Sequence, residues 1–339
     1  MQHKLSTGPL LDANGNLCEA GYSFKMVKEY DRKAIKAGKL RIKEWDYYYI
    51  GNDKYGIALT IDDNSYMNLM SVSVLDFEKR EFVTKSYMKF FTFGKVGFPS
   101  SSIKGDLKYK DSKCDMNFYN DGTKRHLVCY FKNLKNGLDF TCDITLKETN
   151  QDSMVIATPF NKKRHFYYNQ KINCLKAEGY ATFGDKHFDL NDCYGVLDWG
   201  RGVWTYKNTW YWASMSGEKN GVRIGFNLGY GFGDTSKASE NVLFYKDKAY
   251  KLEDVDFGIP NDNTKDIKYM EPWHFTSKDG SIDMIFTPIL DRHDDTDVIV
   301  IKSLQHQVFG KFNGYIIVEG EKVLIEDMLG FAERVHNCW

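Results

Sequence analysis

The chain has 339 residues and no net charge, with 46 Lys and Arg against 46 Asp and Glu. This balance argues against the basic surface that binds nucleic acid or an anionic membrane. Aromatic residues make up 15% of the chain, which is typical of β-strands, and the length is sufficient for two domains with separate cores.

The seven cysteines favour neither a zinc ribbon nor a disulfide framework, because their number is odd and no two have CxxC spacing. Free thiols in a reducing compartment are the simplest interpretation. The first residues lack the apolar core of a signal peptide, and no apolar run is long enough to span a membrane. We therefore expect a cytoplasmic protein without a membrane span.

The first part of the chain differs from the rest. Residues 1–40 are expected to form an N-terminal segment with turns and one helix at about 26–37. The pattern after this segment is one of strands. Two aromatic and aliphatic runs, 45–50 and 55–61, flank a turn of Gly, Asn and Asp and predict a hairpin.

The strand pattern is interrupted at 85–106 by two glycines, a proline and three consecutive serines. A connection of this length exceeds that of an ordinary hairpin. The segment is therefore a candidate lid or pocket wall.

One strand, at 222–232, alternates between an apolar face and a face that is mostly glycine. Glycine on a strand marks strong curvature, or the close approach of another backbone or a ligand, and both remain open. Arg223 and Asn227 share this face and are candidate ligand-binding residues. In the second case, we expect this face to border a cavity that also contacts Asp198, Arg201 or Trp212.

A repeat with a constant offset of 135 residues runs through the second half of the chain. The pairs are Gly179 and Gly314, Tyr180 and Tyr315, Leu190 and Ile325, Asp192 and Asp327, Gly195 and Gly330, Asp198 and Glu333, Arg201 and His336, and Trp204 and Trp339. Two structural units of one kind, at 41–204 and 205–339, are the economical interpretation. Each suits an up-and-down barrel of short antiparallel strands, with a β-sandwich pair as the alternative.

Long motifs spread over essentially the whole chain resemble one bacterial family, known only as domain of unknown function 2804. They are GPLLDANGNLCEAGY near the start, YNQKINC at 168–174, GVLDWGRGVW at 195–204, GFNLGYGFGDTS at 225–236 and HQVFGKFNG at 306–314. The family is remotely similar to the carotenoid 1,2-hydratase (hydroxyneurosporene synthase) group, which has two lipocalin-like barrels. Fungal cyclases that catalyse Diels–Alder closures share this architecture.

The resemblance implies an all-β fold of two lipocalin-like, calycin-type barrels. It also implies a pocket for an apolar ligand between or within the barrels. It transfers no catalytic motif to this chain.

The densest group of interaction-capable residues lies at 198–204. Asp198 and Arg201 can form a bidentate pair, or can present an acid and a clamp for an anion or carbonyl to a cavity. Glu333 and His336 at the equivalent positions favour instead a structural latch that closes each unit, and both interpretations remain open. Apolar walls of a site are expected from Trp204, Trp210 and Trp212.

His306 lies on a predicted strand beside two amides and is a candidate general acid or base, with a hydrogen-bonded structural histidine as the alternative. The other candidate ligand-binding residues are Tyr168, Asn169, Glu240, Asn241 and Lys311. The acidic run at 293–297 has poor ligand geometry, so no metal is expected. No phosphate loop, dinucleotide fingerprint or nucleophile elbow is present, so no cofactor is expected.

We therefore expect a protein that recognises an apolar or amphipathic small molecule. The sequence leaves open whether the protein is an enzyme; the chemistry of an enzyme would be cofactor-free hydration, isomerisation or cyclisation. A non-catalytic carrier of lipid or terpenoid-like ligands is the alternative. A carbohydrate-active or glycan-binding β-protein is a third possibility, for which a paired-carboxylate motif is lacking.

Overall fold

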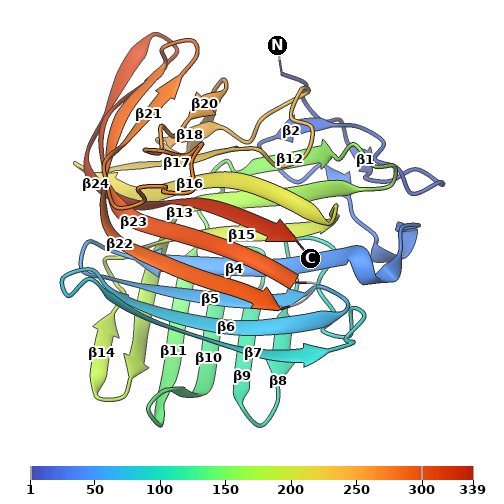
Figure 1. Ribbon diagram of the computed structural model, residues 1–339, viewed down its shortest axis with the longest axis horizontal. Helices are drawn as coiled ribbons and strands as arrows, with labels where there is room; N and C mark the ends of the chain where they lie inside the picture. Colours follow the sequence, from blue (N-terminus) through green and yellow to red (C-terminus); the bar gives the residue numbers. More distant parts are fainter. Residues whose placement is uncertain (1, 299–300, 339) are drawn as a thin grey trace.

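The structure is a computed structural model that describes residues 2–298 and 301–338 (Figure 1). Within these ranges it contains two 3-10 turns, Arg32–Ala34 and Lys39–Arg41, and no α-helix. Nearly all other ordered structure belongs to two curled antiparallel sheets, each a lipocalin-like half-barrel. The all-β, two-unit fold predicted from the sequence is confirmed.

The first sheet has 13 strands, with the main order β7-β6-β5-β4-β15-β13-β11-β10-β9-β8. Its strands are β2 (Gly21–Ser23), β4 (Ile42–Gly51), β5 (Tyr55–Asp63), β6 (Met67–Asp76), β7 (Glu81–Phe90), β8 (Leu107–Lys110), β9 (Cys114–Asn120), β10 (Lys124–Lys135), β11 (Leu138–Lys147), β12 (Met154–Pro159), β13 (Phe166–Phe183), β14 (Lys186–Asp189) and β15 (Tyr194–Val203). A separate parallel pair joins β1 (Gly8–Pro9) to β3 (Lys28–Glu29).

The second sheet has nine strands, in the order β19-β18-β17-β16-β24-β23-β22-β21-β20. They are β16 (Lys207–Lys219), β17 (Val222–Tyr230), β18 (Val242–Tyr245), β19 (Lys248–Lys251), β20 (Val255–Asp256), β21 (Trp273–Ser277), β22 (Ile282–Val298), β23 (Ile301–Val318) and β24 (Glu321–Cys338). The chain changes sheet between Val203 and Lys207. The domain limits 1–40, 41–204 and 205–339 stay predictions.

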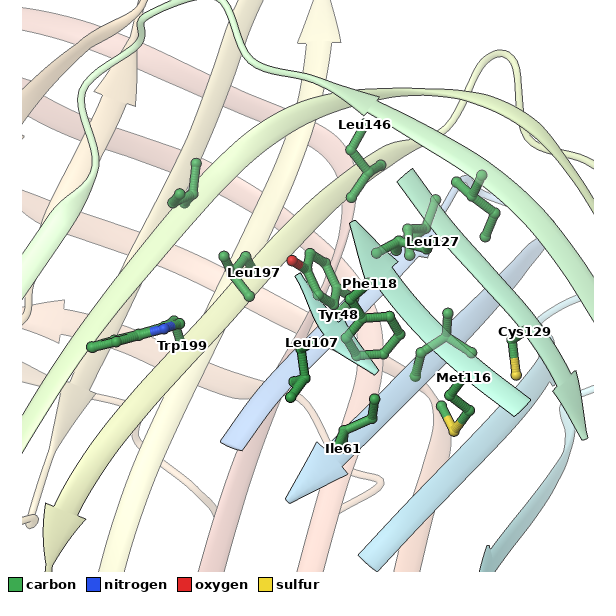
Figure 2. Packing of buried hydrophobic residues seen from close by; sticks show 14 of the residues in the cluster. Tyr48, Ile61, Leu107, Met116, Phe118, Leu127, Cys129, Leu146, Leu197 and Trp199 are labelled. Atoms are coloured by element: carbon green, nitrogen blue, oxygen red, sulfur yellow. The ribbon is translucent and has the colours of Figure 1, made fainter. Parts of the chain in front are cut away.

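Alternation of side chains fills the interior of the first sheet. On β9, Cys114, Met116 and Phe118 are buried while the residues between them are not. Figure 2 shows Met116 and Phe118 packed with Tyr48 of β4 and neighbouring apolar side chains. The sheet curls far enough for β7 to contact β10, where the Tyr87 ring stacks on Phe131 at 4.7 Å. The predicted hairpin at 45–61 is confirmed as β4 and β5.

The predicted helix at 26–37 is wrong. Lys28 and Tyr30 both point inward, which is the alternation of an extended chain. Lys28 lies 2.5 Å from Glu19, and the Tyr30 hydroxyl donates to Glu44 at 2.9 Å. These tertiary contacts outweigh the weak helix propensity of a mixed-charge segment, and a 3-10 turn at Arg32–Ala34 is all that forms.

The segment 85–106 is partly strand, because β7 continues to Phe90. The remaining loop packs onto the first sheet. The carbonyl oxygen of Pro99 accepts a hydrogen bond from Arg201 at 3.1 Å, and that of Ser102 accepts one from Arg125 at 2.7 Å. The loop therefore covers buried side chains of the first sheet. It lines neither of the two cavities described below.

No helix of residues 2–298 and 301–338 has the length and hydropathy that crossing a bilayer requires.

Two glycines, one on β13 and one on β23, have positive φ within a paired strand. Gly179 faces Ile144 with φ 118°, and Gly314 faces Met284 with φ 145°. A Cβ at either position would overlap a carbonyl oxygen across the strand pair, that of Asp143 or Asp283. Both the backbone conformation and the available space therefore require glycine here.

We expect Gly179→Ala and Gly314→Ala each to lower the free energy of unfolding by about 2 kcal/mol or more, from φ strain and steric overlap together. Gly137→Ala is the matched control, because Gly137 has φ 81° but no atom within 4 Å of an added Cβ. Urea denaturation measures all three. Equal losses in the three variants would contradict the steric part of the argument.

Candidate functional site

The two sheets pack face to face, and side chains from both form one buried cluster between them. The first sheet contributes Tyr47 and Tyr49, and the second contributes Trp212, Phe309 and Phe331. Figure 1 shows the long strands β22 to β24, in orange and red, lying over β4, β5 and β6. Polar groups of both sheets are enclosed in this interface.

Asp198 on β15 is buried in the interface, and its partner is a residue other than Arg201. Its carboxylate accepts a hydrogen bond from Asn169 at 2.5 Å and lies 2.8 Å from the ammonium of Lys171 on β13. The same ammonium lies 3.8 Å from the centre of the Trp212 ring. Lys171 is thus held by a carboxylate of its own sheet and an aromatic face of the other.

Glu333 on β24 is equally buried. It accepts hydrogen bonds from the Trp210 indole at 2.8 Å and from the Gln307 amide at 3.0 Å. Burial raises the pKa of Glu333 to about 7, although the indole hydrogen bond and the charge of Lys171 oppose the shift. This carboxyl group therefore holds a proton part of the time at neutral pH.

The two buried acids have matching surroundings. Each lies between a long polar residue on one neighbouring strand and an aromatic residue on the other. The sets are Lys171, Asp198 and Tyr47 in the first sheet, and Gln307, Glu333 and Trp212 in the second. The contacts between the sheets are reciprocal, as in a two-fold interface: Tyr47 donates to Gln307 at 3.3 Å, and Trp212 covers Lys171.

A third carboxylate, Glu240, joins the cluster from the segment before β18. Asn227 donates to it at 3.1 Å and accepts from the Trp212 indole at 2.6 Å. Burial raises the pKa of Glu240, with the nearby charge of Lys171 acting in the opposite direction. Three carboxylates therefore share the field of one lysine.

A small cavity of about 10 Å³ borders Glu240. Its other walls include Tyr167, Gly229 and Phe232. The expectation that the glycine-bearing face would share a cavity with Asp198, Arg201 or Trp212 is wrong, since none of these three lines the cavity at Gly229. That face instead permits close packing, because a Cβ on Gly225 would lie 2.6 Å from the sulfur of Cys174 in the first sheet.

A larger cleft of about 590 Å³ opens at one end of the interface between the sheets. Its apolar lining comes from both sheets and consists of Tyr49, Tyr55, Tyr194, Val196, Met215, Met328, Leu329 and Phe331. The charged residues that line it are Asp53, Lys54, Asp189, Asp192, Glu218, Lys219, Glu326 and Asp327. The volume is that of a small-molecule site.

Asp198 and Arg201 do not form the bidentate pair that was one interpretation of their spacing, and they do not share a cavity. Residues three apart on a strand point to opposite faces, so Arg201 enters the interior of the first sheet. There it bonds Asp46 at 3.0 Å and stacks 4.0 Å from Trp199. His336 likewise lies on the face of β24 opposite Glu333 and hydrogen-bonds Thr209 at 2.7 Å. A latch made of these acid and base pairs is therefore wrong as well.

The structure places His306 on the face of β23 opposite Gln307, away from the buried acids. Its Nδ1 lies 2.7 Å from Asp291, and its ring stacks 3.8 Å from that of Tyr269. Lys311 lies beside the cleft, 2.7 Å from Asp327 and 3.5 Å from Asp53.

Three further candidates make contacts of an architectural kind. The Tyr168 hydroxyl donates to the Lys28 carbonyl at 3.0 Å. Arg223 pairs with Asp247 at 2.6 Å, and Asn241 accepts from the Gly229 amide at 2.7 Å.

Trp204 and Trp210 form an aromatic group with Trp45, Tyr167 and Phe232 at the other end of the interface. Trp339, the expected counterpart of Trp204, lies outside the described residues. Sequence reasoning missed Lys171 and Tyr47, and it missed the cleft residues such as Tyr49 and Phe331. The signal for Lys171 was a lysine in the otherwise uncharged run YNQKINC at 168–174.

Within 2–298 and 301–338, no group of three or more His, Cys, Asp or Glu residues has the arrangement to hold a metal ion.

The family model for domain of unknown function DUF2804 matches residues 2–339, so the chain belongs to this family, as the sequence motifs predicted. No curated protein matches the chain. A solved structure of a Nitrosomonas europaea protein, described as a candidate AttH, is 12% identical with a TM-score of 0.55, over 92% of this chain and 98% of the other. Kievitone hydratase from Nectria haematococca is 13% identical with a TM-score of 0.50, over 87% of this chain and 88% of the other. At such identities the likeness shows a shared fold.

The raised pKa of Glu333 predicts a specific pH dependence of stability. The unfolded chain releases this proton near pH 4.5 and the folded chain near pH 7, so the folded state binds more protons between these values. The free energy of unfolding therefore falls as pH rises through this window, by on the order of 3 kcal/mol from this group. Glu333→Gln should remove that fall.

Chemical denaturation at about pH 5 and about pH 8 measures the effect as a difference between wild type and variant. Glu178→Gln is the control, because Glu178 is an exposed partner of Lys147. Parallel pH profiles for wild type and Glu333→Gln would show that Glu333 is ionised throughout the window.

Proposed function

We propose that this member of the DUF2804 family binds an apolar or amphipathic small molecule in the cleft between its sheets and acts on it by cofactor-free acid–base chemistry. The observation that carries the proposal is the short spacing, along shared strands, between residues of the cleft and residues of the buried cluster. On four strands, a cleft residue lies two positions from a cluster residue on the same face. The pairs are Tyr49 and Tyr47, Val196 and Asp198, Ser214 and Trp212, and Phe331 and Glu333. Two positions on a strand span about 7 Å.

In this proposal Glu333 takes the role of the acid. Its pKa of about 7 suits a group that gives and regains a proton at neutral pH. Asp198, the acid expected from the sequence, is committed to Lys171 at 2.8 Å. This pair then supplies fixed charges beside the reacting groups, in a buried interface.

Hydration or its reversal is the first reaction type to test. The chain shares its fold with a protein named kievitone hydratase, and adding water to an unsaturated ligand needs an acid and no cofactor. Isomerisation and cyclisation make the same demand of the site and belong to the same proposal.

A carrier is the second candidate, and one observation favours it. The Phe331 ring lies on the cleft and packs edge-on against Trp212 at 4.8 Å. Glu333 lies on the cluster side of this aromatic pair, so a bound molecule reaches its carboxyl only if the rings move. A carrier needs no such movement.

We further infer that the two sheets are copies of one unit, with the change between domains at about residue 204. Equivalent strand pairs support this. Ile144 faces Gly179 as Met284 faces Gly314, and Leu175 faces Gly195 as Gly310 faces Gly330. The reciprocal contacts of the buried cluster would then be those of a fused dimer.

Filling the cleft should abolish binding. Met328 is half-buried in the cleft lining, and Met328→Trp adds a rigid ring there without a change of charge. We expect N-phenyl-1-naphthylamine, a neutral fluorescent apolar probe, to bind the wild type and to bind Met328→Trp at least roughly tenfold more weakly. Met88→Trp, on exposed β7, is the control and should bind as the wild type does. If Met328→Trp and Met88→Trp bound the probe with equal affinity, the binding site would lie outside the cleft.

A turnover experiment separates enzyme from carrier. Native mass spectrometry of gently purified protein identifies a ligand that co-purifies, and conversion of that ligand is then followed. If Glu333 is the acid, Glu333→Gln should lower turnover by roughly 10²-fold or more and leave ligand affinity unchanged. Glu178→Gln should alter neither. A Glu333→Gln protein with full turnover would remove this residue from the mechanism, and a wild type that returns the ligand unchanged would identify a carrier.

A further inference from the structure

The rim of the cleft is acidic, although the whole chain carries no net charge. Six carboxylates line the cleft against two lysines, and a third lysine beside the cleft, Lys311, pairs with Asp327 and Asp53. One of these lysines, Lys219, already pairs with Glu326 at 2.6 Å. Asp189, Asp192 and Glu218 form no ion pair with any described residue, so the rim has an unbalanced negative field.

The floor of the cleft differs in character from its rim. Tyr49, Val196 and Phe331 are buried and come from three strands of the two sheets. Two methionines, Met215 and Met328, add side chains that adapt to ligands of different shapes. An apolar body can therefore lie on the floor while a polar end remains at the rim.

The hydroxyl of Tyr49 is an independent sign of a ligand. Tyr49 is 7% exposed, and its hydroxyl has no hydrogen-bond partner among the described residues. A buried polar group without a partner costs about 1–3 kcal/mol. The position is nevertheless built for this ring, since a Cβ on Gly51 or Gly56 would overlap it. Burial also raises the pKa of Tyr49 well above its ordinary value, so the group stays a neutral phenol that can accept a hydrogen bond.

From these observations we infer that the ligand of the cleft is a cationic amphiphile, with an apolar body on the floor and a protonated amine at the acidic rim. This inference rests on the proposed binding site and adds the charge of its ligand. An ammonium group donates hydrogen bonds to carboxylates, and it is attracted to aromatic faces such as those of Tyr55 and Tyr194. The Tyr49 ring starts on the floor, but its hydroxyl lies beside Gly51, next to the rim residue Asp53, and can accept a hydrogen bond there.

A metal ion fits the same charge less well. The carboxylates come from different strands and turns, and in the part of the chain that the structure describes no three of them converge as metal ligands. A metal would also leave the apolar floor without a function. An organic cation uses both halves of the cleft.

The test compares three probes of equal chain length by calorimetry on the full-length protein at about pH 7, where octylamine is protonated. The probes are octylammonium, 1-octanol and octanoate. We expect octylammonium to bind roughly tenfold more tightly than octanol, and octanoate to bind most weakly. Added salt should weaken the binding of octylammonium and leave that of octanol unchanged, because only the former is electrostatic.

The double variant Asp192→Asn, Glu218→Gln should reduce the advantage of octylammonium over octanol to about threefold or less, at unchanged octanol affinity. Asp266→Asn is the matched control, because Asp266 is exposed, pairs with Lys268 and does not line the cleft. Circular dichroism melting confirms that all variants fold.

Two failures have different meanings. If neither octylammonium nor octanol binds, or if Met328→Trp binds both as the wild type does, the proposed cleft site is wrong. If octanol or octanoate binds as tightly as octylammonium in a manner that Met328→Trp abolishes, the cleft stands and the cationic ligand is overturned.

Discussion

One buried ammonium, beside two buried carboxylates and a third that is half-buried, constrains the centre of this molecule. Lys171 lies 2.8 Å from Asp198, and its charge also acts on Glu240 and Glu333. One cation balances one carboxylate, so the other two remain costly to ionise, and their pKa values rise. An interface of apolar side chains would hold two sheets together at least as well. A stack of polar groups at this place therefore argues for a function beyond joining the sheets.

The aromatic residues make this polar centre possible. Trp212 covers the lysine with its face and donates its indole N–H to Asn227, so one ring serves the charge and the hydrogen-bond network together. Trp210, two positions earlier on β16, donates its indole N–H to Glu333. The sheets approach closely because Gly225 faces Cys174 without a side chain. Packing, hydrogen bonding and charge thus depend on the same short stretches of β16, β17 and β24.

The sequence predicted the architecture better than the site. Alternation and the repeat are local or periodic signals, and they were sufficient for an all-β fold of two units. The helix at 26–37 failed because the burial of Lys28 and Tyr30 depends on partners elsewhere in the chain. Asp198 was identified, but its partner was not. A bulge between Ile172 and Leu175, with Cys174 at φ 59°, shifts the register of β13 against β15. Alternation counted along β13 through this bulge therefore does not show that Lys171 lies on the same face of the sheet as Asp198. The contacts of Trp212 and Tyr47 join two sheets, and no spacing within one strand encodes them.

The strands separate the charge at the rim from the buried cluster. Asp327 at the rim and Glu333 in the cluster are six positions apart on β24, which spans about 20 Å. At that separation, and at an effective dielectric constant of about 20, an ammonium at the rim would favour the ionised form of Glu333 by less than about 1 kcal/mol before screening. Salt reduces this effect further, because the distance exceeds the Debye length. A cation bound at the rim would therefore lower the pKa of Glu333 only slightly from about 7. The part of a ligand that comes near this acid is the apolar body on the floor, because Phe331 lies two positions from Glu333.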